Sequence, residues 1–419
     1  MYRVAFLTSA VFAAIAIFFS FVSTGRSRPS HVSGRNNTVL FLAGGASGLS
    51  NIHVAASYGL QEHAHHIELH FASFAGRQEY VSRISSMATR KFTAASPISW
   101  HELPSPDYLT AVYRHIGNIS GMIFPPGLKG SQRLAAGMGF HLDPWEPDEY
   151  VRLYQHVRDL IIQLDPAVIV LDMSLRPALD ATRDLNRNFV ILSPNALVDT
   201  IAAGQPWGKS LWKYPATASG LAYPLEWKWI PLNIYLHVRF AIAYLVNQDE
   251  ESRRAYYRSK GIQNHDHFLT IKDVPWITMT IPEAALPIAV PDGVTECGPV
   301  VLDVANVRDV NQELYDWLQR GPTILINLGS LMKYDESRAK IMAHTIQLLL
   351  QTTEVQVIWK FAKLGDYGDE FLRPLLRFKD NSRLRLSSWL EVEPAALLHS
   401  GQIVLSVHHG GANCFHEAI

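Results

Sequence analysis

The stretch Gln402-Ile-Val-Leu-Ser-Val-His-His-Gly-Gly-Ala-Asn-Cys-Phe-His-Glu417 decides the fold of this 419-residue chain. Its apolar half ends at Val407, the pair Gly410-Gly411 turns the chain, and a helical segment follows. The first turn of a helix presents backbone N–H groups without partners, and the helix dipole makes that end positive. The stretch therefore predicts a strand–loop–helix unit whose helix mouth binds a phosphate or a diphosphate.

The same alternation of apolar runs and helical segments extends over most of the chain. Residues 39–43 are an apolar run, residues 44–48 are rich in glycine, and residues 51–62 carry a helical pattern. A strand, a loop, a helix and a second strand in this order form the repeating unit of a parallel sheet. Residues 94–148 are rich in proline, glycine and histidine and are predicted as irregular loops with short helices, and residues 287–299 are predicted as a link that contains proline and glycine. Further strands are predicted at residues 67–74, 167–171, 189–192, 276–281, 323–328, 355–361, 384–386 and 403–407, and helices at residues 150–164, 306–320 and 336–351.

Length and composition limit the class of protein. A chain of 419 residues is too long for one core, so we expect two α/β domains, residues 36–302 and 303–419, with ligands beyond the carboxyl ends of their strands. The formal net charge of −1 gives no electrostatic case for binding nucleic acid. Cys297 and Cys414 make neither a disulfide framework nor a zinc site. The histidines within residues 63–70 fit no zinc pattern, so no metal is expected.

The N-terminal segment points to a membrane. Residues 4–22 are nearly all apolar, and their length is close to the ~20 residues that span a bilayer. This segment, together with its flanks at residues 1–25, is interpreted as either a membrane anchor or a cleaved signal peptide. A third interpretation is a buried helix of a soluble domain. We therefore expect a membrane-associated protein of the endoplasmic reticulum or secretory pathway. Two arginines that follow the segment favour a cytoplasmic body, whereas two downstream glycosylation sequons favour the lumen, so the side of the membrane stays open.

Trp389, the stretch His409-Gly-Gly-Ala-Asn413 and Glu417 together resemble the nucleotide-sugar signature of the family 1 UDP-glycosyltransferases. Gly329-Ser330, which follows a predicted strand, matches the first phosphate loop of that family. The resemblance spans residues 39–419. It implies the GT-B fold, in which two Rossmann-like domains face each other across a cleft. The first domain would bind the acceptor and the second a UDP-sugar, with no further cofactor.

The resemblance also implies a role for each residue of the signature. Trp389 is expected to stack on uracil, the alternative being a core tryptophan. Cys414 stands where the family has serine, and a thiol is a weaker donor than a hydroxyl. Glu417 is expected to accept hydrogen bonds from the ribose, and the alternative is an acidic side chain that is exposed to solvent on a helix. For Gly329-Ser330 the alternative is a plain turn without a ligand. The residues predicted to bind the UDP-sugar are Gly329, Ser330, Trp389, His409, Gly410, Gly411, Asn413, Cys414 and Glu417.

The implied reaction transfers a sugar from UDP to an acceptor hydroxyl with inversion, and the helix mouth stabilises the departing diphosphate. Gly48-Leu-Ser-Asn51 matches the family block that carries the catalytic histidine, but Leu49 occupies the position of that histidine and takes no proton. Asp172 matches the aspartate that orients the histidine. The candidate catalytic residues are therefore Asp172 and His53, which lies one helical turn after Leu49. The alternatives are a catalytically inactive relative that binds a nucleotide-sugar or a lipid, and an enzyme for another nucleotide.

The acceptor is expected to be a small lipophilic molecule, because the first domain is apolar and residues 225–246 are hydrophobic and aromatic. That segment is either a membrane-touching or acceptor-lining helix or an ordinary amphipathic packing helix. The loop after Trp389 is longer than in the family. Since the family pattern continues beyond the position of Ile419, we expect the second domain to be incomplete in this chain.

Overall fold

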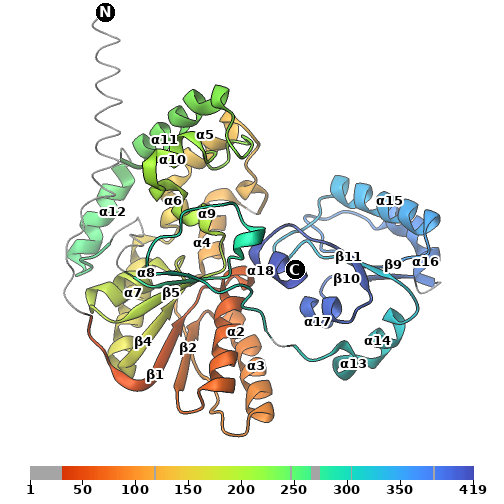
Figure 1. Ribbon diagram of the computed structural model, residues 1–419, viewed down its shortest axis with the longest axis horizontal. Helices are drawn as coiled ribbons and strands as arrows, with labels where there is room; N and C mark the ends of the chain where they lie inside the picture. The colour runs from red at the N-terminus through yellow and green to blue at the C-terminus, as the bar shows by residue number, and fades with distance from the viewer. Residues whose placement is uncertain (1–30, 118, 246–247, 266–273, 303, 381–382) are drawn as a thin grey trace, which may run out of the picture. The chain divides into compact units, whose positions relative to one another are not determined.

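The computed structural model describes residues 31–117, 119–245, 248–265, 274–302, 304–380 and 383–419. The chain divides between Gly298 and Pro299 into two compact units, close to the boundary predicted at residues 302 and 303. Each unit contains an open sheet of parallel strands with helices packed on it (Figure 1). The predicted α/β class with two Rossmann-like sheets is confirmed.

Unit 1, which ends at Gly298, contains a seven-stranded sheet in the order β3-β2-β1-β4-β5-β6-β7. The strand order reverses between β1 and β4, and loops beside such a switch point bind ligands in open parallel sheets. Gly44 lies in the loop after β1, and Asp172 follows β4 directly. The strands are β1 (Arg35–Leu42), β2 (Glu68–Ser73), β3 (Ser99–Glu102), β4 (Pro166–Leu171), β5 (Phe189–Ser193), β6 (Trp276–Thr278) and β7 (Val294–Glu296).

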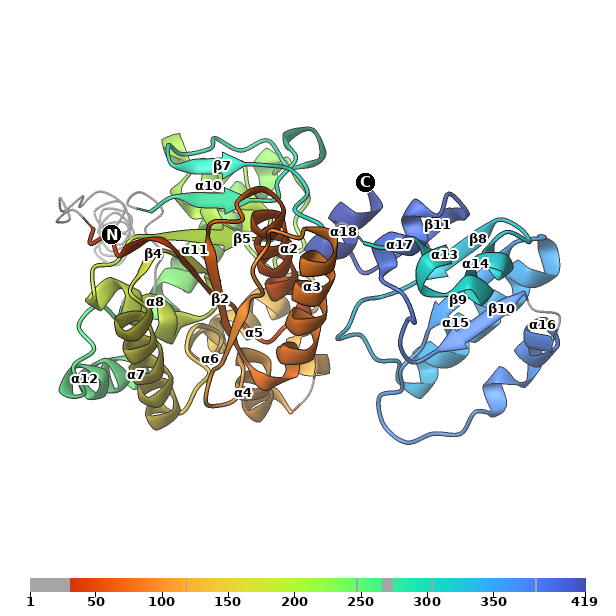
Figure 2. The same ribbon diagram turned by 90° about the horizontal axis from the view of Figure 1, so that it is seen from below.

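Helices cover both faces of this sheet, as Figure 2 shows for α7 and α8 on one side and α2 and α3 on the other. Leu40 and Leu42 of β1 belong to the core that contains α7 and α8, whereas the ring of Phe41 contacts His53 of α2 edge to face. This alternation follows from the two-residue period of a strand and explains why residues 39–42 of β1 are all apolar. The helices are α2 (Ser47–His63), α3 (Gln78–Lys91), α4 (Tyr108–Ile116), α5 (Leu128–Ala136), α6 (Met138–Leu142), α7 (Pro147–Leu164), α8 (Arg176–Asp184), α9 (Leu197–Ile201), α10 (Lys209–Trp212), α11 (Ile230–Leu245) and α12 (Gln248–Ser259).

Unit 2, from Pro299 onward, contains a four-stranded sheet in the order β10-β9-β8-β11. Ile324 and Ile326 of β8 pack with residues of α15 on one face, and Leu325 packs with Leu314 of α14 on the other. The strands are β8 (Thr323–Ile326), β9 (Gln356–Lys360), β10 (Leu384–Ser387) and β11 (Ile403–Val407). The helices are α13 (Val307–Val310), α14 (Gln312–Leu318), α15 (Glu336–Thr352), α16 (Leu376–Asp380), α17 (Pro394–His399) and α18 (Ala412–Ala418).

Three segments differ from the elements predicted from the sequence. The strands β3 and β7 lie in segments where no strand was predicted, whereas the helices α4 to α6 agree with the short helices expected within residues 94–148. Both strands are short edge strands, so they show too few residues for the alternation of a strand to be visible. The single helix predicted over residues 306–320 is divided at Asn311, whose side chain accepts a hydrogen bond from the N–H of Leu314 and so caps a new helix, α14.

Two predictions about membrane contact fall on different parts of the chain. The apolar segment at residues 4–22 lies outside the described residues. Within the described ranges, no helix has both the length and the apolar character that crossing a bilayer requires. The segment at residues 225–246 contains the 3-10 turn η5 (Trp227–Trp229) and helix α11.

Candidate functional site

Three loops of unit 2 bring predicted donor-binding residues to one edge of its sheet. Gly329 lies in the loop after β8, Trp389 in the loop after β10, and His409 in the loop after β11. Because these strands are parallel, all three loops leave the carboxyl edge, where open α/β sheets bind ligands. These residues are up to 80 positions apart in the sequence, and the fold of unit 2 brings them to one end of that unit.

The imidazole of His409 lies between two glycines. A Cβ on Gly329 would be 2.6 Å from Cε1 of His409, and a Cβ on Gly411 would also be 2.6 Å from that atom. Any side chain at either position would therefore displace the ring. Burial, and in addition the charge of His408, lower the pKa of His409. The ring is thus neutral at neutral pH and has one N–H to donate.

Lys360, the last residue of β9, connects these loops. Its Nζ donates to the carbonyl oxygen of Gly329 at 3.2 Å and lies 3.8 Å from the centroid of the Trp389 ring. The second contact is a cation–π interaction. Burial lowers the pKa of Lys360, and the neighbouring Cys414 acts in the opposite direction. Trp389 itself is 62% exposed, so its indole lies at the surface and not in the core.

Helix α18 begins at the same edge, with Gly411 as its N-cap residue. Burial, followed by the charge of Glu417, raises the pKa of the Cys414 thiol to about 11, so this group is a protonated and weak donor. Burial, followed by the charge of Glu393, raises the pKa of Glu417 to about 7. The carboxyl group predicted to bind ribose hydroxyls therefore titrates near neutral pH.

The remaining predicted donor residues differ in accessibility. Gly410 has a φ of +75°, in the left-handed region that favours glycine, and its N–H donates to Nδ1 of His408 at 3.2 Å. Ser330 is exposed and Asn413 is half-buried. The Gly410 amide and the His408 ring would have to separate before that amide could bind a phosphate.

In unit 1, Asp172 fastens the loop that follows β1. Its side chain is 1% exposed and accepts three hydrogen bonds. Oδ2 accepts from the N–H of Gly44 at 3.0 Å, and Oδ1 accepts from the N–H and the hydroxyl of Ser174, both at 2.8 Å. A Cβ on Gly44 would lie 2.8 Å from Oδ2, so glycine is required for this close approach.

His53 of α2 lies in the core of unit 1, where its side chain is fully buried. Its Nδ1 donates to the carbonyl oxygen of Leu49 at 3.2 Å, since a carbonyl can only accept. Nε2 makes no hydrogen bond within the described residues. Burial lowers the pKa of His53, and the charge of Asp172 opposes this effect. The ring is therefore a neutral base without solvent contact.

A second carboxylate, Asp107, lies against the next glycine of the same loop. A Cβ on Gly45 would lie 2.8 Å from Cβ of Asp107 and nearer still to its Oδ2. Oδ1 accepts from the N–H of Thr110 at 2.8 Å and caps α4. Asp107 is half-buried, in contrast to Asp172. The pair Gly44-Gly45 thus lies between one closed and one accessible carboxylate.

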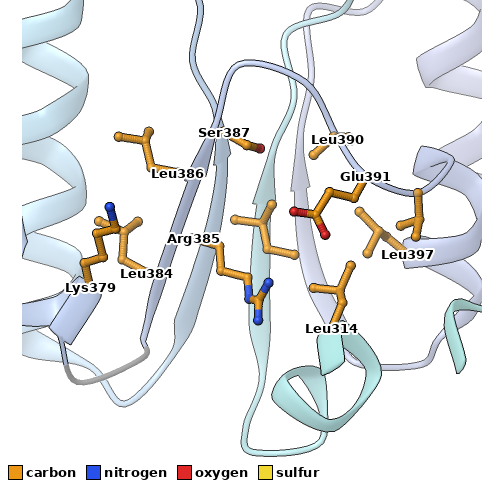
Figure 3. A pocket seen from close by; sticks show the side chains of 11 residues that line it. Leu314, Lys379, Leu384, Arg385, Leu386, Ser387, Leu390, Glu391 and Leu397 are labelled. Carbon is orange, nitrogen blue, oxygen red and sulfur yellow. The ribbon is translucent and has the colours of Figure 1, made fainter. Parts of the chain in front are cut away.

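Unit 2 also contains a pocket of about 170 Å³ beside the loop that follows Trp389. Figure 3 shows Leu386 on one side of it, Leu390 and Glu391 on the other, and Arg385 between them. Arg385 forms an ion pair with Glu313. None of the predicted donor-binding residues lines this pocket, whereas Leu390, Glu391 and Val392 of the loop after Trp389 do.

Comparison with known proteins identifies the family. No family model matches the chain. The glycosyltransferase sdnJ of Sordaria araneosa is 33% identical over 396 residues, which cover 91% of this chain and 77% of the relative. The chain belongs to the family 1 UDP-glycosyltransferases.

Solved structures of UDP-glycosyltransferases share the fold. The structure of Medicago truncatula UGT71G1 with UDP-glucose matches with a TM-score of 0.54 and 14% identity, over 91% of this chain and 78% of that chain. Phytolacca americana UGT2 with UDP-2-fluoro-glucose and pterostilbene matches with a TM-score of 0.50 and 14% identity, over 93% of this chain and 78% of that chain.

In this UDP-glycosyltransferase, sequence reasoning missed two residues at the loop edges. Lys360 ends a predicted strand, but only the strand order places it beside Gly329 and Trp389. Asp107 follows β3, a strand that was not predicted. A charged residue at the last position of a buried strand was the available signal for Lys360. Among the described residues, no three His, Cys, Asp or Glu side chains are grouped so that they could hold a metal ion.

Proposed function

We propose that this chain transfers a sugar from a UDP-sugar to the hydroxyl of a small lipophilic acceptor, with inversion. The contact of His409 with Gly329 and Gly411 supports the proposal, because an imidazole and two glycines lie together at the carboxyl edge, where we expect the diphosphate to depart. Lys360 supplies positive charge beside the same loops. Donors aimed at a leaving diphosphate stabilise the charge that grows in the transition state, without a metal.

The uridine and ribose would be bound beside these loops. The exposed indole of Trp389 offers an aromatic face for uracil, and Lys360 stands over that indole at 3.8 Å. Glu417 would accept hydrogen bonds from the ribose hydroxyls. Its pKa of about 7 implies that donor binding strengthens as the pH rises through neutrality, because the carboxylate accepts more hydrogen bonds than the carboxylic acid.

The acceptor class is supported by the apolar, aromatic character of unit 1 and by the ligands of structural neighbours. Phytolacca americana UGT2 was solved with pterostilbene, a small lipophilic molecule. The apolar residues 4–22 would anchor the chain or direct it to the secretory pathway, so we propose a membrane-associated enzyme of the endoplasmic reticulum or secretory pathway.

The acceptor hydroxyl needs a base, and Leu49 removes the histidine of the family. Asp172 and His53 are the predicted catalytic residues, but both are buried and Asp172 accepts three hydrogen bonds. Asp107 is the more accessible of the two carboxylates that lie against the loop after β1. We therefore add Asp107 to Asp172 and His53 as a candidate base, acting directly or through a water.

The test is UDP release from UDP-glucose by the full chain, with a panel of sterols and phenols at pH 7–8. Acceptor-dependent release that His409→Ala abolishes supports the proposal. Tight UDP binding without turnover, unchanged in Asp172→Ala, would support the inactive relative instead, and preference for another nucleotide would support a different nucleotide-sugar enzyme. If calorimetry finds no affinity for UDP at all, the assignment is wrong.

The candidate bases can be separated in the active enzyme by Asp107→Asn, Asp172→Asn and His53→Gln. Asp107→Asn keeps an oxygen that accepts from Thr110 and so preserves the helix cap. Asp335→Asn is the matched control, because Asp335 caps α15 in the same way in unit 2. Loss of the acid limb of the pH–rate profile identifies the base. An unaltered profile in a variant removes that residue from the list.

A further inference from the structure

Unit 1 exposes an unusual number of indoles in one short segment. Four of the ten tryptophans of the chain lie at positions 207, 212, 227 and 229, and all four are exposed. Trp207 is 88% and Trp227 is 83% exposed, whereas Trp145 and Trp276 in the same unit are fully buried. A tryptophan that stays in water forgoes the burial of a large apolar surface. Such a group of exposed indoles indicates a surface that contacts something apolar.

Helix α11 extends this surface with a reversed pattern of burial. Tyr235 and Ile242, which are two helical turns apart and so share a face, are exposed, and Pro231 on the same face is exposed as well. The polar Asn233 is fully buried on the opposite side. A surface helix of a soluble domain normally turns its polar residues outward. The outward face of α11 is apolar at Pro231, Tyr235 and Ile242, with Arg239 as a basic residue among them.

A hydrogen-bond clamp joins α11 to the segment that carries the first two indoles. The side chain of Asn233 accepts from the N–H of Ala216 at 2.7 Å and donates to the carbonyl oxygens of Leu211 and Tyr214 at 3.0 and 2.9 Å. The Nε1–H of Trp212 donates to the carbonyl oxygen of Trp207 at 3.0 Å. Figure 1 shows α10 and α11 together at one end of unit 1. The indoles and the α11 face are therefore parts of one structure, here called the aromatic end (residues 206–245).

The aromatic end also differs in charge from the rest of the protein. It contains the basic residues Lys209, Lys213, Lys228 and Arg239 and one acidic residue, Glu226, whereas the whole chain has 37 basic and 38 acidic residues. Lys228 forms an ion pair with Glu226 at 2.7 Å, so three basic residues remain without a carboxylate of this region to balance them. Indoles and tyrosines prefer the boundary between lipid headgroups and acyl chains, and basic residues beside them bind anionic headgroups. A surface that combines both properties without a spanning helix is typical of proteins that lie on a membrane.

We propose that the aromatic end docks on the surface of a lipid bilayer that contains anionic lipids, with Trp207 and Trp227 inserted at the headgroup–acyl boundary. This contact is additional to any anchoring by residues 4–22 and does not depend on the proposed transferase activity. It would hold unit 1 against the phase in which lipophilic molecules are dissolved. A second copy of the chain is the competing occupant, and the experiment below distinguishes it from a bilayer.

The experiment uses the full chain with vesicles of phosphatidylcholine and phosphatidylserine that carry dibrominated acyl chains. Bromine quenches tryptophan emission on contact, and residues 1–30 contain no tryptophan, so the N-terminal segment cannot produce the signal. We expect brominated vesicles to quench the wild type, and Trp207→Phe/Trp227→Phe to remove most of that quenching. Trp389→Phe is the matched control, because this exposed indole lies in unit 2. It should leave the quenchable part of the emission unchanged.

Three results would overturn the proposal. The first is a wild type that brominated vesicles do not quench, and the second is equal quenching in the double variant. The third is a dimer in sedimentation equilibrium that Trp207→Phe/Trp227→Phe dissociates, since a second copy would then cover the surface. Far-UV circular dichroism and thermal unfolding establish that each variant is folded, and Trp212→Phe/Trp229→Phe provides a second pair from the same aromatic end.

Discussion

Replacing Gly411 by alanine isolates the part that His409 plays in donor binding. The φ of Gly411 is −64°, which alanine adopts without strain, so the new methyl group acts only through its contact with the imidazole. Because the His409 ring is exposed at the surface, it can swing away, and the fold loses little stability. The displaced ring no longer reaches a diphosphate, so Gly411→Ala should behave in binding as His409→Ala does.

The size of the effect follows from the bond that is lost. A hydrogen bond to a charged group contributes about 1.5–3 kcal/mol, which corresponds to a roughly 10- to 150-fold rise in Kd. Gly410→Ala provides the contrast, because a Cβ there meets no atom within 4 Å while its φ is +75°. That variant should lose about 1–2 kcal/mol of folding free energy through backbone strain. It should leave the position of His409 unchanged.

Isothermal titration calorimetry with UDP-glucose and thermal unfolding measure the two effects separately. The double variant Gly411→Ala/His409→Ala should bind no more weakly than either single variant, because both changes remove the same interaction. Wild-type affinity in Gly411→Ala, or fully additive losses in the double variant, would refute the reasoning. Either result would mean that the imidazole does not bind the donor from the position between the two glycines.

Three further predictions concern other parts of the molecule. Lys360→Met should weaken UDP-glucose binding about tenfold and reduce the dependence of that binding on salt, because it removes a positive charge beside the phosphate loop. Calorimetry at two ionic strengths measures both effects. The affinity for UDP-glucose should rise between pH 6 and pH 8, because Glu417 ionises with a pKa of about 7. Glu417→Gln should flatten that rise. A rise that persists in Glu417→Gln would contradict the role of Glu417 in binding the ribose. Tyr150→Phe should lower the free energy of unfolding by about 1–3 kcal/mol in a urea titration, because the hydroxyl donates to the buried carboxylate of Asp180 at 2.5 Å. Equal stability of variant and wild type would show that this bond contributes nothing.

The sequence predicts the buried parallel strands well and the edge strands poorly. Residues 167–171 form a continuous apolar run, and Thr323 is the one polar residue of the buried strand at residues 323–326, so both strands can be predicted without knowledge of their neighbours. The edge strands β3 and β7 carry polar residues such as Glu102 and Glu296 and are too short to show a period. Their strand character arises from pairing with β2 and β6, which local sequence does not report.

The candidate site divides in a similar way. The glycine and histidine pattern at residues 409–411 encodes a local geometry, and the structure shows that Gly329 and Gly411 leave room for the His409 ring. Lys360 and Asp107 become neighbours of the loops only through the order of strands, which a pass along the sequence does not give. The base is the least predictable part. Leu49 stands where a histidine would have identified the base. The candidates that remain are the buried Asp172 and His53 and the more accessible Asp107.

The pairing of β1 with β4 has a consequence for biosynthesis. Val39 of β1 aligns with Val168 of β4, so one side of the central strand has no partner until the ribosome has synthesised the residues between them. At 5–20 residues per second this takes roughly 6 to 26 seconds. Throughout that interval the nascent polypeptide presents an apolar strand edge to its surroundings. We expect newly made chains to depend on chaperones during this window, and pauses in translation before codon 168 to increase aggregation.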